Sequence, residues 1–256
     1  LEFLTITYLF LAIFIGMIGY FVYFQLVKSE SIINSSYNSR LDLYAEHVVR
    51  GDITAADGTV LAKTTVNGDG SETREYPYGR MFAHVVGYMN NGKGGLESQY
   101  NFNLLRSHSF FLTQIINDLK DQKNTGDTLV TTLDYDVQKA AYDALGNRDG
   151  AVVVMEPKTG KILAMVSKPD YDPNTLVDKW DDIVSDDSSS VLLNRVTSGL
   201  YPPGSTFKIF TTLEYVHENP NYQDYSFNCE GELNVDGNEI HCYHKSVHGQ
   251  ENLKDS

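Results

Sequence analysis

The feature that most constrains this chain is a long apolar stretch near its beginning. Residues Leu4 to Val27 include no Asp, Glu, Lys or Arg. As a helix, this stretch would be about 36 Å long, against about 30 Å for the hydrocarbon core of a bilayer. Tyr23 and Lys28 stand near its end, where interfacial side chains are typical. We therefore predict a transmembrane helix and anchor over residues 1–28, rather than a buried core helix or a cleaved signal peptide.

The composition excludes several classes of protein. Lys plus Arg number 20 and Asp plus Glu number 34, so the formal net charge is −14. Without a basic stripe, such a chain is a poor candidate for binding nucleic acid. Hydrophobic residues make up 41% of the 256 residues, which excludes a disordered chain and suffices for one large or two small domains. The two cysteines exclude a disulfide-dense scaffold.

After a polar stalk at 28–40, the chain is expected to have an α+β fold. Residues 29–125 are predicted to form a small, irregular module, and Gly126 begins a second module that runs over 126–256. In the first module we expect a hairpin of 48–54 with 59–61, a turn at 67–70 and a short helix at 96–105. In the second we expect a strand at 128–133 and then a helix after Asp134, in which Val137, Ala140, Ala141, Ala144 and Leu145 recur at helical spacing. A hairpin of 151–155 with 161–166, a solvated acidic loop at 171–190 and a helix from Ser205 to Val216 should follow.

One short motif carries chemistry. Ser205-Thr206-Phe207-Lys208 follows a Pro-Pro-Gly break and is the only Ser-x-x-Lys of the chain. Positions i and i+3 share one face of a helix, so the Ser205 hydroxyl and the Lys208 amine can meet there. A lysine amine is almost fully protonated at neutral pH, so Lys208 can act as a base only if its surroundings are desolvated and electropositive. We therefore expect Lys208 to be buried. By itself the motif fits a capping serine and a surface lysine equally well.

The surrounding motifs resemble those of class B penicillin-binding proteins, which are membrane-anchored peptidoglycan transpeptidases. Essentially the whole chain takes part in the resemblance, and the pieces stand in the family's order. They are the apolar helix, Arg50-Gly51-Asp52-Ile53, Asp57-Gly58-Thr59-Val60-Leu61-Ala62, Arg74-Glu75-Tyr76-Pro77, His84-Val85-Val86-Gly87-Tyr88, Gly95-Leu96-Glu97, Gly150-Ala151-Val152-Val153-Val154, Thr159-Gly160-Lys161-Ile162-Leu163-Ala164-Met165 and Tyr201-Pro202-Pro203-Gly204-Ser205-Thr206-Phe207-Lys208.

The resemblance implies a D,D-transpeptidase that needs no cofactor. Ser205 would attack the carbonyl between two D-Ala residues of a peptidoglycan stem peptide, and Lys208 would accept the serine proton. An amine of a second stem peptide would resolve the acyl-enzyme, and β-lactams would acylate the same serine. The Ser205 N–H would supply half of an oxyanion hole.

The resemblance also implies an architecture and a location. Residues 29–125 would be a pedestal, or dimerisation-like, module, and residues 126–256 would begin a transpeptidase domain. The soluble part would lie outside the cytoplasm of a single-pass protein in the cell membrane, with a polytopic glycan-polymerising membrane partner. A carboxypeptidase or β-lactamase of the same superfamily, and an anchored scaffold or β-lactam sensor without catalysis, are the alternatives. The Arg50 and Glu97 side chains are expected to pair at the pedestal surface, where such a pair contributes little.

Three sequence triplets imitate later motifs of the family and are rejected. Lys158-Thr159-Gly160 precedes Ser205 and falls in a hairpin turn, Ser226-Phe227-Asn228 follows Ser205 too closely, and Ser36-Tyr37-Asn38 lies by the membrane. Glu46 and His47 stand where the family often carries a further arginine. The chain stops at about the place where the true Ser-x-Asn would begin, so we expect it to be an inactive piece of a longer protein.

The cysteines Cys229 and Cys242 are separated by 12 residues and open three alternatives. Outside the cytoplasm a disulfide is the leading interpretation, and no metal is expected. A metal site is nevertheless a rival, because His241, His244 and His248 crowd Cys242. Two free thiols are the third alternative.

Overall fold

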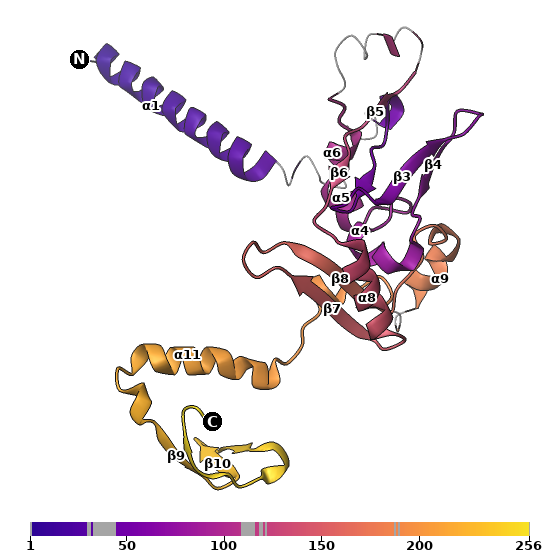
Figure 1. The fold of residues 1–256 in the computed structure, drawn as a ribbon. Helices are drawn as coiled ribbons and strands as arrows, with labels where there is room; N and C mark the ends of the chain where they lie inside the picture. Colours follow the sequence, from indigo (N-terminus) through magenta and orange to yellow (C-terminus); the bar gives the residue numbers. More distant parts are fainter. Residues whose placement is uncertain are drawn as a thin grey trace. The chain divides into compact units, whose positions relative to one another are not determined.

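The computed structural model describes residues 2–29, 32, 45–108, 116–117, 120, 122–186, 188 and 190–255. The chain divides into two compact units, Leu1–Gly199 and Leu200–Ser256. Figure 1 shows the elements of each unit along the chain. Most of the expected stalk and the triplet Ser36-Tyr37-Asn38 fall outside the described residues.

The apolar stretch is helical, as predicted. Helix α1 (Glu2–Tyr23) continues as a π-helical turn, η1 (Phe24–Lys28). The segment Phe3–Lys28 has a mean hydropathy of 2.1, and none of its most apolar window is buried. Its large apolar side chains are therefore exposed all around the helix, an arrangement that suits lipid and not water. By length and composition this helix can cross a bilayer.

A mixed sheet forms the centre of the described residues between 45 and 130, which we call the pedestal. Its strand order is β4 (Glu72–Glu75), β3 (Val60–Val66), β2 (Ile53–Thr54) and β6 (Leu129–Val130), and β2 and β6 run parallel. The predicted hairpin forms between β2 and β3, and the turn predicted at 67–70 joins β3 to β4. Val48–Val49 does not join the hairpin. It forms β1 and pairs in parallel with β5 (Asn124–Thr125), a partner too distant in sequence to be predicted.

Short helices cover this sheet. They are η2 (Gly79–Phe82), α4 (Ala83–Val86), α5 (Gly95–Gln99) and α6 (Asn101–Leu105). The single helix expected at 96–105 is thus interrupted at Tyr100, whose φ of −110° and ψ of 24° are not helical. Leu104 and Val86 bury completely against Ile53 and Leu61 of the sheet. Burial of these side chains holds the short helices in place, because helices of four or five residues are not stable alone.

Gly51 marks a close approach of two backbones. Its N–H donates to the Leu104 carbonyl at 2.8 Å. A Cβ atom at this position would lie 2.1 Å from the Asp127 carbonyl oxygen, a distance at which no side chain fits. The requirement for glycine here comes from the contact with residue 127, not from a turn.

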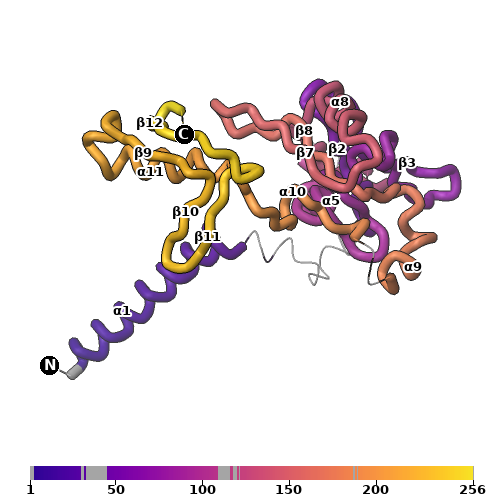
Figure 2. The backbone as a smooth tube through the Cα atoms, turned by 90° about the horizontal axis from the view of Figure 1, so that it is seen from below, coloured from indigo at the N-terminus to yellow at the C-terminus, as the bar shows by residue number. Residues whose placement is uncertain are grey.

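The helix expected after Asp134 packs on the second predicted hairpin. Helix α8 (Tyr135–Leu145) begins where the Asp134 carboxylate accepts a hydrogen bond from the Val137 N–H. It lies against β7 (Gly150–Met155) and β8 (Ile162–Lys168), as Figures 1 and 2 both show. Of the apolar residues expected on its inner face, Ala141 is buried, whereas Ala140 and Ala144 are exposed.

Helix α8 also buries a glutamine side chain, although buried positions of a helix are usually apolar. Gln138 is completely buried in α8. Its amide nitrogen donates to the Met81 and Met165 carbonyls at 2.7 and 2.9 Å, and its amide oxygen accepts from the Met165 N–H at 2.8 Å. Burial of the amide is tolerated because these hydrogen bonds replace those with water. The glutamine thereby fastens α8 to β8 and η2.

The acidic segment 171–190 is solvated only in part. Its aspartates Asp178, Asp181 and Asp182 are exposed, as expected. Tyr171 and Leu176 are buried, and the segment forms η3 (Val177–Lys179) and α9 (Trp180–Ser185) before α10 (Arg195–Ser198) follows. The expectation of a loop was therefore wrong for the apolar positions, which pack on the pedestal around Ala83.

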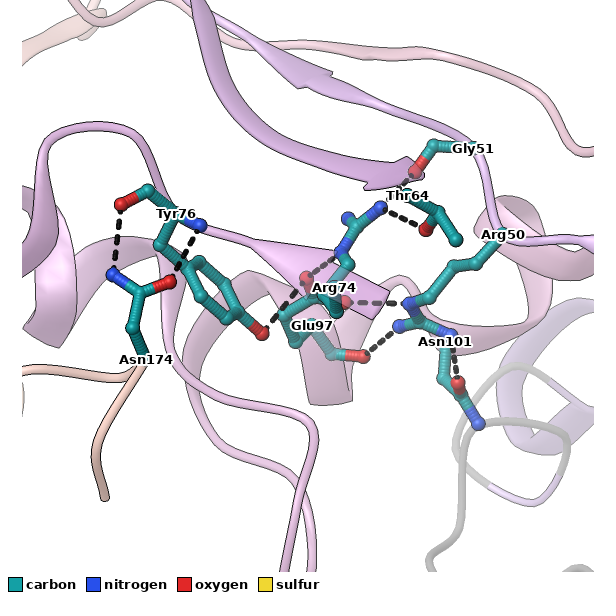
Figure 3. A network of polar contacts seen from close by, with 8 residues as sticks. All are labelled: Arg50, Gly51, Thr64, Arg74, Tyr76, Glu97, Asn101 and Asn174. Atoms are coloured by element: carbon teal, nitrogen blue, oxygen red, sulfur yellow. Dashed lines mark hydrogen bonds and ion pairs between the residues drawn. The ribbon is translucent and has the colours of Figure 1, made fainter. Parts of the chain in front are cut away.

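The pair of Arg50 and Glu97 forms, but the prediction of a surface pair was wrong. Figure 3 shows that the Glu97 carboxylate lies between two guanidinium groups. Arg50 Nε lies 2.6 Å from one carboxylate oxygen, and Arg74 Nε lies 2.8 Å from the other. The exposed fractions of the three side chains are 4%, 2% and 0% for Arg50, Arg74 and Glu97. This network is part of the pedestal core.

The polar groups around the carboxylate are almost completely paired. Arg50 also donates to the Asn101 side chain and to the Glu97 carbonyl, at 2.6 and 2.7 Å. Arg74 Nη1 donates to Gly51 O at 2.8 Å and to Thr64 Oγ1 at 3.0 Å. Among the described residues, the one buried side-chain nitrogen or oxygen without a partner is Arg74 Nη2. Two guanidinium groups thus share one buried carboxylate, and the hydrogen bonds offset the rest of the free-energy cost of burying these charges.

The network reaches a second segment through Tyr76. The Tyr76 hydroxyl donates to Glu97 Oε1 at 3.3 Å, and burial, with help from Glu97, raises the pKa of this hydroxyl. The Tyr76 backbone N–H and carbonyl pair with the Asn174 side chain at 2.9 and 3.0 Å (Figure 3). Asn174 belongs to the acidic segment, so the network and this segment are joined through a single tyrosine.

The second unit consists of one helix and two hairpin-like strand pairs. After η4 (Gly204–Phe207) come α11 (Lys208–Glu218) and η5 (Tyr222–Asp224). Strand β9 (Ser226–Cys229) pairs with β12 (Gly249–Asn252), and β10 (Glu232–Val235) pairs with β11 (Asn238–His241), with η6 (Tyr243–Lys245) between β11 and β12 (Figure 2). The predicted helix from Ser205 is confirmed, with a 3₁₀ first turn.

Replacing Glu97 tests the buried network. We expect Glu97→Gln to lower the free energy of unfolding by about 3–5 kcal/mol, because two buried guanidinium groups lose their counter-charge while the side-chain volume is kept. Urea unfolding of the detergent-solubilised protein measures this change through the fluorescence of Trp180, the single tryptophan. Asp143→Asn, which breaks the exposed pair with Lys139, is the matched control and should leave the midpoint unchanged. Equal stability of the Gln variant and the parent would contradict the structural importance of the network.

His84 should make stability depend on pH. Its Nε2 lies 3.1 Å from the Pro169 carbonyl, and burial lowers the pKa of the imidazole. Because the folded pKa lies below the unfolded value of about 6.5, the unfolded chain takes up the proton first. The contribution is complete above about pH 6.5 and is lost as the pH falls toward the folded pKa. Urea midpoints measured between pH 7.5 and 5.5 should fall less steeply in His84→Gln than in the parent; equal slopes would refute this.

Candidate active site in the second unit

Ser205 and Lys208 stand where the chain enters its last long helix. Gly204, with a φ of 56°, turns the chain after the two prolines, and the 3₁₀ turn η4 carries Ser205. Lys208 is the first residue of α11. The two residues are three positions apart at the N-terminal end of the helix, where free N–H groups favour negative charge. A serine oxygen or an oxyanion at this place is therefore in a favourable field.

A pocket of about 570 Å³ lies within the second unit, and both residues line it. Its other walls come from β9, from the β10–β11 hairpin and from the segment around β12. Their lining residues are Tyr225, Phe227, Cys229, Glu232, Leu233, Ile240, His241, Cys242, Tyr243, His248, Glu251 and Asp255. The pocket thus combines aromatic and aliphatic side chains with one lysine, three carboxylates and two imidazoles.

The structure does not bear out the expected burial of Lys208. Its side chain is exposed, as is that of Ser205. Within the described residues of this unit, no hydrogen bond joins the serine hydroxyl to the lysine amine. The physical reason is local: the one helix and the short strands of this unit do not surround the start of α11. The two groups share a pocket, but the desolvation that a neutral amine requires is not supplied by these residues.

Of the triplet Ser226-Phe227-Asn228, the two polar residues do not line this pocket. Along β9, Phe227 and Cys229 line the pocket, whereas Ser226 and Asn228 do not, because successive side chains of a strand point to opposite faces. Ser226 and Asn228 instead contact Gln250 and Glu230. The triplet Lys158-Thr159-Gly160 lies in the turn between β7 and β8, as predicted.

Several pocket residues were not singled out from the sequence. Tyr225 and Glu251 belong to no motif, and Phe227 was named only within a rejected triplet; the pairing of β9 with β12 brings them together. The signal that could have found them is the alternation along β9. Once Cys229 is placed in a wall, Phe227 and Tyr225 follow at two-residue steps.

The two cysteines meet in the wall of the same pocket. Their sulfur atoms are 3.4 Å apart and unbonded in this structure, and Nδ1 of His248 lies 3.4 Å from Cys229 Sγ. The hydrogen bonds with His248 lower the pKa of the Cys229 thiol to about 7, and the hydrogen bond with Cys229 raises the pKa of Cys242. The disulfide predicted from the sequence stays a prediction.

Of the three histidines that crowd Cys242 in sequence, one joins the cysteines. The potential ligand atoms of Cys229, Cys242 and His248 lie within 4.8 Å of one another. His241 points to Glu232 and Glu239, with nitrogen–oxygen distances of 3.9 and 3.5 Å. The His244 ring lies edge-on to the Tyr243 ring, with the two ring centres 4.1 Å apart. Proximity in sequence therefore did not decide which imidazole belongs to the cluster.

Two models of known protein families match the chain. Residues 50–129 match the model "Penicillin binding protein A dimerisation domain", and residues 150–256 match "Penicillin binding protein transpeptidase domain". The first match contains the Arg50–Glu97 network, and the second contains Ser205, Lys208 and the whole pocket.

Curated relatives carry the corresponding names. The chain is 38% identical over 188 residues to peptidoglycan D,D-transpeptidase PbpA of Mycolicibacterium smegmatis, an alignment that covers 67% of this chain and 38% of the relative. It is 34% identical over 180 residues to peptidoglycan D,D-transpeptidase MrdA of Acinetobacter baumannii, covering 57% of this chain and 26% of that protein. The chain therefore spans less than half of the curated relatives it matches.

Solved structures agree with the sequence matches. A D,D-transpeptidase domain from Eggerthella lenta superposes with a TM-score of 0.70 at 33% identity, covering 81% of this chain and 46% of that one. Penicillin-binding protein A of M. tuberculosis, in its imipenem acyl-enzyme complex, gives a TM-score of 0.72 at 29% identity, with coverages of 82% and 52%. By its two family matches, its relatives and its fold, this chain belongs to the class B penicillin-binding proteins.

Proposed function

We propose that the whole protein is a peptidoglycan D,D-transpeptidase in which Ser205 is the nucleophile. The observation that carries the proposal is the joint position of Ser205 and Lys208 in one pocket at the start of α11. The family and the acyl-enzyme complexes of its solved members with β-lactams add support. The same pocket would accept β-lactams, which acylate the serine in place of the stem peptide.

The reaction proceeds through an acyl-enzyme. Ser205 Oγ attacks the carbonyl carbon between the two D-Ala residues, and its proton passes to Lys208. The Ser205 N–H stabilises the negative charge on the carbonyl oxygen, with the helix start behind it. The terminal D-Ala leaves with a proton, and an amine of a neighbouring stem peptide then attacks the ester and frees Ser205. The product is a crosslink between two peptides.

Lys208 needs further surroundings for this role. The amine has to lose its proton at neutral pH, which requires burial or a positive neighbour. The pocket residues described here leave it exposed. In the whole protein, substrate and the remaining part of the transpeptidase domain supply this cover, in agreement with the fraction of the relatives that the chain spans.

The anchor and the pedestal complete the proposal. The soluble part lies outside the cytoplasm, where peptidoglycan is crosslinked, and α1 holds it to the membrane as a single pass. We also propose that the pedestal and α1 contact a polytopic glycan-polymerising partner. The support for this contact is the resemblance to the family, together with the large apolar surface of α1.

Labelling with a fluorescent penicillin tests the site. We expect the full-length protein to form a stable adduct at Ser205, which peptide mass mapping locates. Ser205→Ala should abolish the adduct, and Lys208→Ala should slow its formation by about 10²–10⁴-fold, the usual contribution of a general base. Ser226→Ala is the matched control and should label as the parent does, because Ser226 lies outside the pocket. An adduct on another residue would overturn the assignment of the nucleophile. Rapid turnover of penicillin would instead favour a hydrolase.

Protease accessibility tests the location. Protease added to intact cells stripped of their wall should digest the soluble part and leave a membrane-protected fragment that contains α1. The reason is that residues after Lys28 would then lie on the outer side of the bilayer. Complete protection of the soluble part until the membrane is opened would place it in the cytoplasm instead.

A further inference from the structure

We infer that Asn194 is a positioning residue for the acylation of Ser205, because it ties the pedestal to the segment from which the nucleophile follows. Asn194 directly precedes α10 and stands 11 residues before Ser205 in the chain. It would therefore act through the backbone and not on the reacting atoms. The inference rests on the proposed function, since it concerns the same reaction at the same serine.

The Asn194 side chain makes two separate kinds of contact. Its amide oxygen accepts a hydrogen bond from the Val196 N–H at 3.0 Å, so the residue caps the start of α10. Its amide nitrogen donates to the His84 carbonyl of α4 at 3.1 Å and lies 3.5 Å from Met165 Sδ in β8. An aspartate could cap the helix equally well, but an ionised carboxylate has no hydrogen to donate. The bridge to the pedestal, and not the cap, therefore requires an amide.

The pedestal end of this bridge is held in place by other contacts. His84 is buried, its ring lies edge-on to the Tyr171 ring, and its Nε2 lies 3.1 Å from the Pro169 carbonyl. The last four carbonyls of a helix find no partner within it, and α4 has only four residues. Asn194 supplies the donor that the His84 carbonyl needs. The bridge thus satisfies a helix end of the pedestal as well as the start of α10.

The far end of α10 leads to the nucleophile through a short connection. Ser167 of β8 donates to the Leu193 carbonyl at 3.1 Å and accepts from the Arg195 N–H at 3.0 Å, so the chain is fixed on both sides of Asn194. Residues 199–203 then separate α10 from η4, and two of these five residues are prolines, whose φ is nearly fixed. A short and stiff connection transmits a displacement of α10 to the turn that carries Ser205.

Loss of the bridge would therefore affect the rate of acylation more than the fold. Without the amide nitrogen, α10 keeps its cap and its contacts with Ser167, but it loses its hydrogen bond to the pedestal. A displacement of about 1 Å at a reacting atom can cost about 10²-fold in rate. The rate at which Ser205 reacts should thus depend on how the pedestal holds α10.

Acylation kinetics of the full-length protein test the inference. Asn194→Asp keeps the size and the cap of the side chain, and we expect it to lower the second-order rate constant for labelling by fluorescent penicillin by about 10–100-fold. The fraction of chains labelled at long times should stay at the parent value. A merely structural role predicts the reverse, namely a smaller labelled fraction that reacts at the parent rate. Asn194→Ser also caps a helix but has a shorter side chain, and it should react as slowly as the Asp variant.

Asn174→Asp is the matched control. The Asn174 amide nitrogen also donates to a pedestal carbonyl, that of Tyr76 at 3.0 Å, but it stands 31 residues before Ser205. This variant should be acylated at the parent rate. Parent rates in both Asn194 variants, or equal slowing in the Asn174 variant, would refute the inference and leave the proposed function intact. A parent protein that is not labelled at Ser205 would overturn the proposed function, and the inference with it.

Hydrogen exchange gives a second measurement, which does not use the reaction. The backbone amides of residues 195–201 should exchange faster in Asn194→Asp than in the parent, because the segment has lost one of its attachments. The same amides should exchange at the parent rate in Asn174→Asp. Identical exchange in the parent and in Asn194→Asp would show that the bridge does not hold this segment, and would overturn the inference.

Discussion

The pedestal depends on one buried negative charge. Glu97 is fully buried and contacts Arg50, which directly follows β1, and Arg74, which belongs to β4. A buried carboxylate without such partners would cost several kcal/mol, and so would either guanidinium alone. The three groups are therefore stable only together, and their geometry fixes the ends of β1 and β4 against α5. Through Tyr76 the same network holds Asn174 and with it the acidic segment, which lies within the transpeptidase match.

The second unit combines two chemistries in one small pocket. Ser205 and Lys208 line the pocket from the start of α11, and the two thiols line it from the strand part of the same unit. Successive side chains of β9 point to opposite faces of the strand, which explains which of its residues line the pocket. Phe227 and Cys229 face the pocket, and the polar residues Ser226 and Asn228 face away. The proposed reaction takes place at the start of the helix.

Local signals predicted the elements that depend on local interactions. The apolar helix, the β2–β3 and β7–β8 hairpins, and α8 with its Asp134 cap follow from periodicity, turn residues and capping chemistry within a few positions. The pairing of β1 with β5 and the break at Tyr100 depend on contacts with distant segments. Gln138 illustrates the limit: a polar residue in a helix is expected to face water, and only the carbonyls of Met81 and Met165 make its burial possible.

Ordered motifs and an uncharged apolar stretch were enough to predict the family, a membrane-spanning helix and the candidate nucleophile, because these signals need no spatial information. The pairing of Arg50 with Glu97 was also predicted. Three features depend on the three-dimensional structure: this pair is buried, His248 rather than His241 or His244 joins the cysteines, and Lys208 is exposed among the residues described. Burial and ligand geometry depend on which distant segments meet, and spacing along a chain does not contain that information.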